Sequence, residues 1–220
     1  MLDQNPMTFL LEASKCESFE HSRDHMEQSM LFRNKKQQRL YHVRRAIKNG
    51  IEGGLYVEFG VAKGDGCRTF GEVLGEHDLT LTGFDSFEGL EEDWTGMHTG
   101  RQAGALSTKG KLPEVPDNVA FEEGWVQDTL PGYLKANGKA PFAFIHMDMD
   151  TYTPTAYALA AVKSRLRKGT VILFDELYGY PGWRYHEYKA LTETLSEGDY
   201  QYISFSAEAV GIEMLRTPKK

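Results

Sequence analysis

Short apolar runs and amphipathic stretches alternate through most of the chain, and this alternation constrains the fold more than any other feature. Strands are predicted over residues 55–59, 79–84, 118–123, 141–147 and 170–174. Helices are predicted over residues 36–48, 65–76, 126–137, 153–168 and 184–197. Strands that alternate with helices pair in parallel through right-handed crossovers. The pattern therefore predicts an α/β fold with a doubly wound, mostly parallel sheet.

The two ends of the chain depart from this alternation. After the last predicted helix, YQYISFS and AVGIEML form two strand-like runs with only a short turn between them. Without a crossover helix, this closing pair should contain an antiparallel strand at or near an edge of the sheet. Residues 1–35 are polar and rich in methionine, so we expect a lid or a subunit interface there. A single domain is expected over residues 36–220.

Composition excludes several classes of protein. The chain has 220 residues, of which 40% are hydrophobic, as expected for one globular domain. Its net charge of −7 argues against a nucleic-acid binder. Two cysteines are too few for a disulfide framework. Because neither a signal-peptide pattern nor a long apolar run is present, we expect a cytoplasmic protein without a membrane partner.

Ligands bind at the carboxyl ends of the strands in sheets of this kind. The first strand ends in EFGVAKGDG, where Gly60, Gly64 and Gly66 allow a tight turn into a helix. The spacing matches neither the dinucleotide-binding nor the P-loop motif, and a plain strand-to-helix turn also explains the glycines. Glu58 favours a ligand site, because a carboxylate at the end of an apolar strand needs a partner.

The next two strand ends also carry polar groups. Asp85 follows the second strand, where an acidic residue suits the diol of a ribose, although it could also start an Asx turn. After the third strand, Trp125 could lie against an adenine or pack in the core, with Gly124 before it and Asp128 close behind. Together, the glycine turn and Asp85 indicate a nucleoside cofactor.

Two acidic pairs follow the fourth and fifth strands. Asp148 and Asp150 stand one residue apart, and Asp175 is followed by Glu176. If these strands are neighbours, four carboxylates meet, and a divalent cation relieves their repulsion. Oxygen ligands favour magnesium, calcium or manganese over zinc. The alternative is a set of solvated carboxylates that cap helices. His146 is expected to be a hydrogen-bonded core side chain rather than a ligand.

The chain resembles the macrocin O-methyltransferase-like family in five ordered segments: YVEFGVAKGDG, GFDSFEGL, GWVQDTLP, FIHMDMDTY and VILFDELYGYPGW. Members are class I S-adenosylmethionine-dependent enzymes that include sugar O-methyltransferases of antibiotic pathways. The resemblance extends from about Gln37 almost to the C-terminus. It implies a Rossmann-like methyltransferase fold, S-adenosylmethionine as cofactor and a hydroxyl acceptor.

The resemblance also implies roles for single positions. The cofactor would be contacted by Glu58, Gly60, Val61, Gly64, Asp85, Ser86, Gly124, Trp125, Asp128 and Asp148. Within this set, the glycine turn would hold the methionine part, Asp85 the ribose and Trp125 the adenine. The metal, Mg²⁺ or another hard divalent cation, would be held by Asp148, Asp175 and Glu176, with Asp150 as general base. Some members carry Asp where this chain has Glu176, and the extra methylene could alter metal binding.

These features predict a divalent-metal-dependent O-methyltransferase that moves a methyl group from S-adenosylmethionine to a hydroxyl of a sugar or glycosylated small molecule. One alternative is a metal-dependent glycosyltransferase that uses the Asp-x-Asp pair. Another is a non-catalytic cofactor-binding protein on an enzyme fold. The long segment 85–117 is expected to cover the substrate. Tyr178, Tyr180 and Trp183 are expected either to shape the acceptor pocket or to pack an irregular loop.

Overall fold

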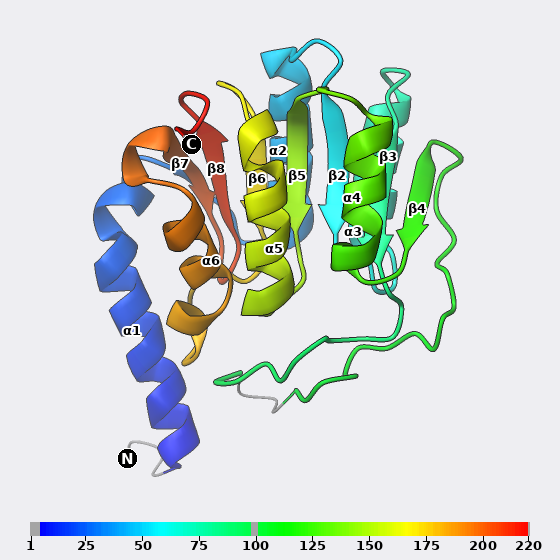
Figure 1. Cartoon of the computed structure of the whole chain (residues 1–220). Helices are drawn as coiled ribbons and strands as arrows, with labels where there is room; N and C mark the ends of the chain where they lie inside the picture. Colours follow the sequence, from blue (N-terminus) through cyan, green and yellow to red (C-terminus); the bar gives the residue numbers. More distant parts are fainter. Residues whose placement is uncertain (1–4, 98–100, 220) are drawn as a thin grey trace.

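A computed structural model describes residues 5–97 and 101–219 of the chain. Within these residues the chain forms one eight-stranded sheet, in the order β1-β7-β8-β6-β5-β2-β3-β4 (Figure 1). The strands are β1 (Met30–Leu31), β2 (Leu55–Phe59), β3 (Leu81–Asp85), β4 (Val119–Glu123), β5 (Phe142–Met147), β6 (Val171–Phe174), β7 (Tyr200–Phe205) and β8 (Val210–Met214). The α-helices are α1 (Pro6–Met26), α2 (Lys35–Asn49), α3 (Asp65–Gly75), α4 (Val126–Ala136), α5 (Tyr152–Val162) and α6 (Glu187–Thr194). The predicted doubly wound α/β fold is confirmed.

The strand directions explain how the sheet closes at its C-terminal side. β8 pairs antiparallel with both β6 and β7, which confirms the predicted antiparallel strand. This strand lies inside the sheet, because β7 and then β1 continue beyond it. β1 pairs in parallel with β7 through Met30 and Leu31. A strand of two residues carries no periodicity, so the sequence did not predict it.

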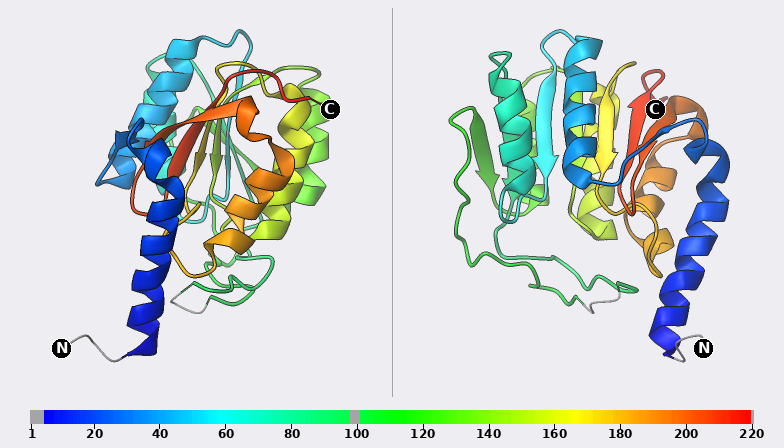
Figure 2. Two further views of the ribbon diagram at one scale, coloured as in Figure 1. Left: turned by 90° about the vertical axis from the view of Figure 1, so that its left-hand side faces the viewer. Right: turned by 180° about the vertical axis from the view of Figure 1, so that it is seen from behind.

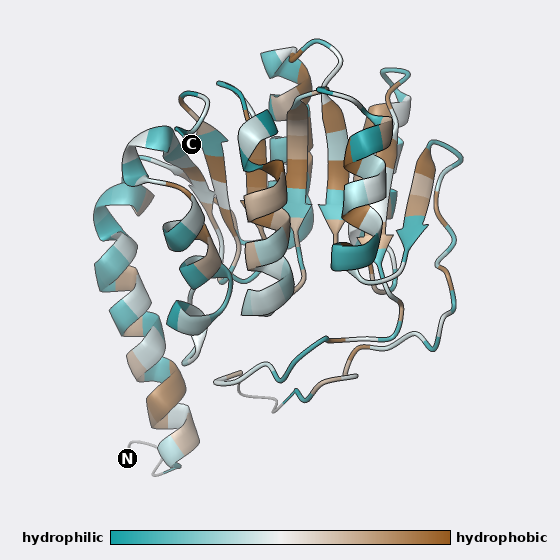
Figure 3. Ribbon diagram, viewed as in Figure 1, coloured by the Kyte–Doolittle hydropathy of each residue, from teal (hydrophilic) through white to brown (hydrophobic). Residues whose placement is uncertain are grey.

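Helices cover both faces of the sheet (Figure 2). α2 and α3 lie on one face, and α4, α5 and α6 lie on the other. The side chains of β2 alternate between these two layers, with Val57 and Phe59 in one core and Tyr56 in the other. The strands are hydrophobic along their length, but β2, β4 and β5 become hydrophilic at their carboxyl ends (Figure 3).

The helix α1 runs along the side of the domain, beside α6 and β7. Its buried residues are Ser14, Ser18 and Ser22, which recur every fourth position. The hydroxyl of Ser18 bonds the carbonyl of Ser14 at 2.7 Å, so this face packs without an apolar stripe. That composition explains why hydrophobic periodicity did not predict a helix over these residues. Phe9 is 71% exposed, and whether α1 serves as a lid or a subunit interface stays a prediction.

Two predicted helices are shorter in the structure. α5 ends at Val162 and continues as a 3₁₀ turn over Lys163–Arg165, and α6 begins only at Glu187, after a 3₁₀ turn over Trp183–Tyr185. No helix within residues 5–97 and 101–219 combines the length and apolar character that membrane crossing requires.

Candidate active site

A cavity of about 410 Å³ opens at the carboxyl ends of the strands. The predicted residues that line it are Gly60, Asp85, Ser86, Gly124, Trp125, Asp148, Asp150 and Glu176. Described residues of the segment after β3 line the cavity, with Trp94 and Met97 buried against the core, and the covering of a substrate by this segment stays a prediction. Tyr178, Tyr180 and Trp183 pack in the core and do not line the cavity. Of the two alternatives for these aromatic residues, the structure shows packing.

The ends of β2, β3 and β5 are joined by backbone hydrogen bonds. The amide of Gly60 donates to the carbonyl of Phe84 at 2.9 Å, and the amide of Asp148 donates to the carbonyl of Phe59 at 2.8 Å. Gly60 has φ of 87°, and a Cβ there would overlap the carbonyl of Asp148. Only glycine satisfies both the backbone angle and the close approach.

Asp85 is held by backbone amides at the end of β3. Its Oδ2 accepts from the amides of Val61 and Ala62, each at 2.7 Å. Its Oδ1 accepts from the amide of Phe87 at 2.6 Å, which is an Asx turn. Asp85 therefore forms the turn and also lines the cavity, so the two interpretations of this residue are compatible.

Glu58 points away from the cavity, towards the α2–α3 face. It is 1% exposed, and its Oε1 lies 2.9 Å from Nδ1 of His146. A Cβ on Gly66 would overlap this carboxylate, so the glycine of α3 makes room for it. The carboxylate thus has the partner that its position required. The other predicted cofactor residues that do not line the cavity are Val61, Gly64 and Asp128.

His146 is fully buried and joins two carboxylates. Its Nε2 lies 3.3 Å from Oδ1 of Asp175, opposite the contact with Glu58. Burial lowers the pKa of His146, but its hydrogen bonds to Asp175 and Glu58 raise it above the usual value. The prediction of a hydrogen-bonded core histidine agrees with these contacts.

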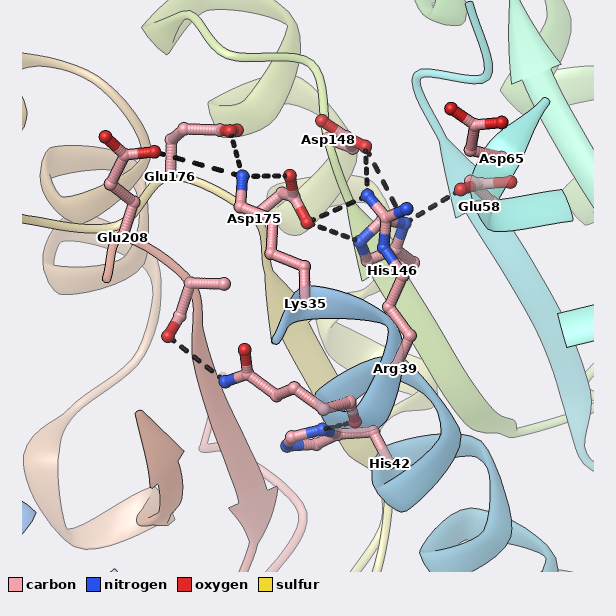
Figure 4. A network of polar contacts seen from close by, with 12 residues as sticks. Lys35, Arg39, His42, Glu58, Asp65, His146, Asp148, Asp175, Glu176 and Glu208 are labelled. Atoms are coloured by element: carbon pink, nitrogen blue, oxygen red, sulfur yellow. Dashed lines mark hydrogen bonds and ion pairs between the residues drawn. The ribbon is translucent and has the colours of Figure 1, made fainter. Parts of the chain in front are cut away.

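The four acidic residues at the ends of β5 and β6, called here the acidic edge, do lie together because the two strands are neighbours. The edge consists of Asp148, Asp150, Asp175 and Glu176. Two cations from the first turns of α2 reach it, Lys35 and Arg39 (Figure 4). The amine of Lys35 donates to Asp175 Oδ2 and Glu176 Oε1, each at 2.7 Å. The guanidinium of Arg39 lies 3.0 Å from Asp175 and 3.4 Å from Asp148.

Sequence reasoning missed Lys35 and Arg39. Their spacing of four residues puts both on one face of a helix. That spacing does not reveal which strand end the face meets, because the contact joins residues separated by 140 and 136 positions. The same limit applies to Glu187, the first residue of α6, which is fully buried beside the acidic edge. Its Oε2 accepts from the amide of Glu176 at 3.2 Å.

The acidic edge retains oxygens that suit a hard cation. Asp148, Asp150 and Glu176 can each offer a carboxylate oxygen within 4.8 Å of the other two. Among the described residues, Glu176 Oε2 and Glu187 Oε1 are buried without a hydrogen-bond partner. Unpaired carboxylate oxygens at this depth are costly unless a cation satisfies them. The residues present therefore fit a divalent metal, although Asp175, a predicted ligand, is outside this group of three.

Burial and mutual repulsion separate the acidic residues by pKa. Burial raises the pKa of Asp150 well above its usual value, and the charges of Glu176 and Asp148 add to the effect. Burial and Asp175 raise the pKa of Glu176 to about 7. Burial also acts on Asp175, but the hydrogen bond from His146 and the charges of Arg39 and Lys35 hold its pKa well below the usual value. The environment therefore favours the charged form of Asp175 and the protonated form of Asp150.

Comparison with known proteins defines the class. The model of a methyltransferase domain matches residues 57–177, more than half of the chain. The chain is 30% identical over 182 residues to the 8-demethyl-8-(2,3-dimethoxy-alpha-L-rhamnosyl)-tetracenomycin-C 4'-O-methyltransferase of Streptomyces olivaceus, covering 72% of this chain and 67% of that protein. It is 28% identical over 195 residues to the mycinamicin III 3''-O-methyltransferase of Micromonospora griseorubida, covering 76% and 73%.

A solved structure shares the fold across nearly the whole length. The calicheamicin methyltransferase CalS11 superposes with a TM-score of 0.67 at 22% identity, covering 96% of this chain and 94% of that chain. The fold and the cavity define a Rossmann-like class I methyltransferase. The chain belongs to this methyltransferase family and is an S-adenosylmethionine-dependent O-methyltransferase. The glycosyltransferase alternative finds no support in these comparisons.

Proposed function

We propose that this enzyme transfers the methyl group of S-adenosylmethionine to a hydroxyl of a sugar on a small molecule, with a divalent cation bound at the acidic edge. The choice of a sugar rests on the two relatives, one named for a rhamnosyl tetracenomycin and the other for mycinamicin III. The choice of a cation rests on the buried oxygens of Glu176 and Glu187 that lack a partner among the described residues.

The cofactor is assigned to the end of the cavity formed by β2, β3 and the start of α4. Asp85 and Ser86 face the ribose in this proposal, and Gly124 and Trp125 face the adenine. S-adenosylmethionine supplies an electrophilic methyl group, so the protein has only to bring the acceptor oxygen in line with it. Glu58 does not line the cavity, but its contact with His146 links β2 to β5 and so helps to hold the strand ends that form the cofactor site.

At the acidic edge we assign Asp150 as the general base. An alkyl hydroxyl has too high a pKa to attack unaided, and a bound divalent cation would act there as a Lewis acid. Asp150 lines the cavity, where its carboxylate can accept the proton of the acceptor hydroxyl. Asp148 and Glu176 hold the cation, with Asp175 as the third ligand proposed from the sequence. The last assignment requires Lys35 to leave Asp175, which it contacts at 2.7 Å.

The proposal extends to assembly and location. We assign the protein to the cytoplasm, as expected from its sequence, and its net charge of −7 argues against a nucleic-acid partner. The N-terminal segment is proposed to act as a lid or a subunit interface, since Phe9, Leu10 and Phe19 on α1 are exposed.

An acceptor screen tests the function. A panel of glycosylated aglycones and their sugar-free counterparts is incubated with methyl-labelled cofactor, and the label is located by mass spectrometry. We expect label on a sugar hydroxyl and none on the sugar-free members. Label on the sugar-free aglycone would contradict the sugar as acceptor. In parallel, S-adenosylmethionine should raise the melting temperature, whereas a UDP-sugar should not.

A further inference from the structure

Lys35 pairs with two of the carboxylates proposed to hold the cation, Asp175 and Glu176. Its amine donates to Asp175 Oδ2 and Glu176 Oε1, each at 2.7 Å, and lies 3.9 Å from Glu208 Oε2. An ammonium has three donors and no acceptor, so three surrounding carboxylates match it. Lys35 also lines the cavity, on the same side as Glu176. In Figure 4 its side chain reaches up from α2 to the space between Asp175 and Glu176.

The backbone of Lys35 is held in a helix, whereas its side chain is partly exposed to solvent. Lys35 is the first residue of α2, and the side chain of Asn34 caps that helix by accepting from the amide of Gln37 at 3.2 Å. The side chain of Lys35 remains 36% exposed, although the side chain of Asp175 is only 6% exposed. A flexible four-carbon chain with a route to solvent can withdraw without disturbing the helix.

Arg39, one turn further along α2, offers a contrast. Its side chain is 14% exposed and is shared between Asp148 and Asp175. The planar guanidinium joins the ends of β5 and β6, and its removal would leave buried charges unpaired. Arg39 is therefore a permanent part of the acidic edge, and Lys35 is the exchangeable cation.

We propose that Lys35 is a resident competitor for the divalent cation. Its amine satisfies Asp175 and Glu176 in the metal-free protein and is displaced when the metal takes those oxygens. The inference rests on the metal site of the proposed function and adds a determinant of its affinity. Because the metal must replace two charge-assisted hydrogen bonds, Lys35 weakens metal binding and keeps the metal-free edge folded.

The matched pair Lys35→Met and Lys36→Met tests this proposal in the full-length protein. Lys36 follows Lys35 in the same turn of α2 but is exposed, so its substitution removes the same charge without the contact. Calorimetric titration with Mg²⁺ and Mn²⁺ should show at least about 10-fold tighter binding to Lys35→Met, since the loss of even one of the two hydrogen bonds to a charged group corresponds to about that factor. Lys36→Met should bind like the unmodified protein.

The possible failures are distinguishable. Equal affinity in all three proteins would overturn the competition while leaving the metal site intact. Absence of binding in all three would overturn the metal site itself. Lys35→Arg keeps the positive charge and should keep the weak affinity. An affinity as tight as that of Lys35→Met would show that charge is not the cause.

A measurement without substitutions covers the case in which Lys35→Met fails to fold. Reductive methylation of the unmodified protein, followed residue by residue by mass spectrometry, reports how free each amine is. Saturation with Mg²⁺ should increase the rate at Lys35 severalfold and leave the rate at Lys36 unchanged. An unchanged rate at Lys35 in the metal-bound protein would overturn the displacement.

Discussion

The two ends of the cavity hold carboxylates in different ways. At the cofactor end, Asp85 accepts three hydrogen bonds from backbone amides of neighbouring turns. At the acidic edge, Asp175 and one oxygen of Glu176 are paired with side-chain cations that α2 supplies from more than 130 residues away in sequence. Backbone amides cannot leave without unfolding the turn, whereas a lysine amine can. The comparison is between one end whose carboxylate is held by the backbone, where we propose the cofactor binds, and one end whose carboxylates are held by side chains, where we propose that a cation is exchanged.

The largest effect should come from the base at the acidic edge. Asp150→Asn preserves shape and removes proton acceptance, so the chemical step should slow by about 10²–10⁴-fold. Cofactor affinity should persist, because Asp85 and the glycine turn do not depend on Asp150. Single-turnover kinetics and calorimetry measure the two quantities separately. Asp148→Asn is the control, and excess Mg²⁺ should partly restore its activity. Rescue of Asp150→Asn instead would exchange the two roles.

Low pH should destabilise the protein through His42 of α2, the helix that supplies Lys35 and Arg39. His42 of α2 is fully buried, its Nδ1 donating to the carbonyl of Gln38 at 2.7 Å and its Nε2 accepting from Ser204 at 3.0 Å. Burial lowers its pKa from 6.5 to about 4, so the unfolded chain binds the proton first as pH falls. This contribution to stability is complete above pH 6.5 and is lost towards pH 4, a change of about 3 kcal/mol.

Urea unfolding at a series of pH values, with NMR observation of the His42 ring, measures this dependence. The loss of stability should follow protonation of His42 in the unfolded state. A ring that titrates near pH 6.5 in the folded protein would contradict the prediction. In that case the packing of α2 against the sheet would not depend on the charge of His42.

The cofactor end should respond in both stability and affinity. Asp85→Ala leaves the amides of Val61, Ala62 and Phe87 without their acceptor. We expect the free energy of unfolding and the free energy of cofactor binding each to fall by about 1.5–3 kcal/mol, the range for hydrogen bonds to a charged group. Asp93→Ala is the matched control, since Asp93 accepts from the amide of Ala103 at an exposed site outside the cavity. Unaltered cofactor affinity in Asp85→Ala would remove Asp85 from the ribose site.

The smallest effect should come from an exposed ion pair near the cofactor end. Arg68 and Asp65 pair on the first turn of α3, with side chains 38% and 78% exposed. Arg68→Ala should therefore change the free energy of unfolding by less than about 1 kcal/mol and leave cofactor affinity unchanged. Thermal unfolding and calorimetry are sufficient to check this. A larger loss would show that a side-chain ion pair, and not only the backbone amides, stabilises the cofactor end.

Prediction from sequence succeeded where the signal was local. Gly60, Asp85 and the acidic pairs could be assigned to the carboxyl ends of strands from the sequence. The alternation of strands and helices shows which end of each strand these residues occupy. Lys35 and Glu187 escaped notice because each reaches the site from a helix whose docking depends on the whole fold. Their roles could be found only once α2 and α6 were placed against the sheet.

Prediction from sequence was also limited because it does not show in which direction a side chain points. Glu58 is the last residue but one of the strand that leads into the cavity, yet the alternation along β2 turns it to the opposite face, against His146. No helix was predicted over residues 6–26, because the buried face of α1 consists of serines rather than apolar residues. In both cases the pattern of apolar residues does not reveal which face the segment presents.

Methyl transfer with and without a divalent cation tests the central claim most directly. The purified protein is stripped with a chelator, and transfer of labelled methyl groups to a sugar-bearing acceptor is followed before and after Mg²⁺ is restored. Cofactor binding is measured in the same samples. If the acidic edge holds the cation that activates the acceptor hydroxyl, turnover will vanish on chelation and return with Mg²⁺, while cofactor binding persists. Full turnover in the stripped protein would contradict the account.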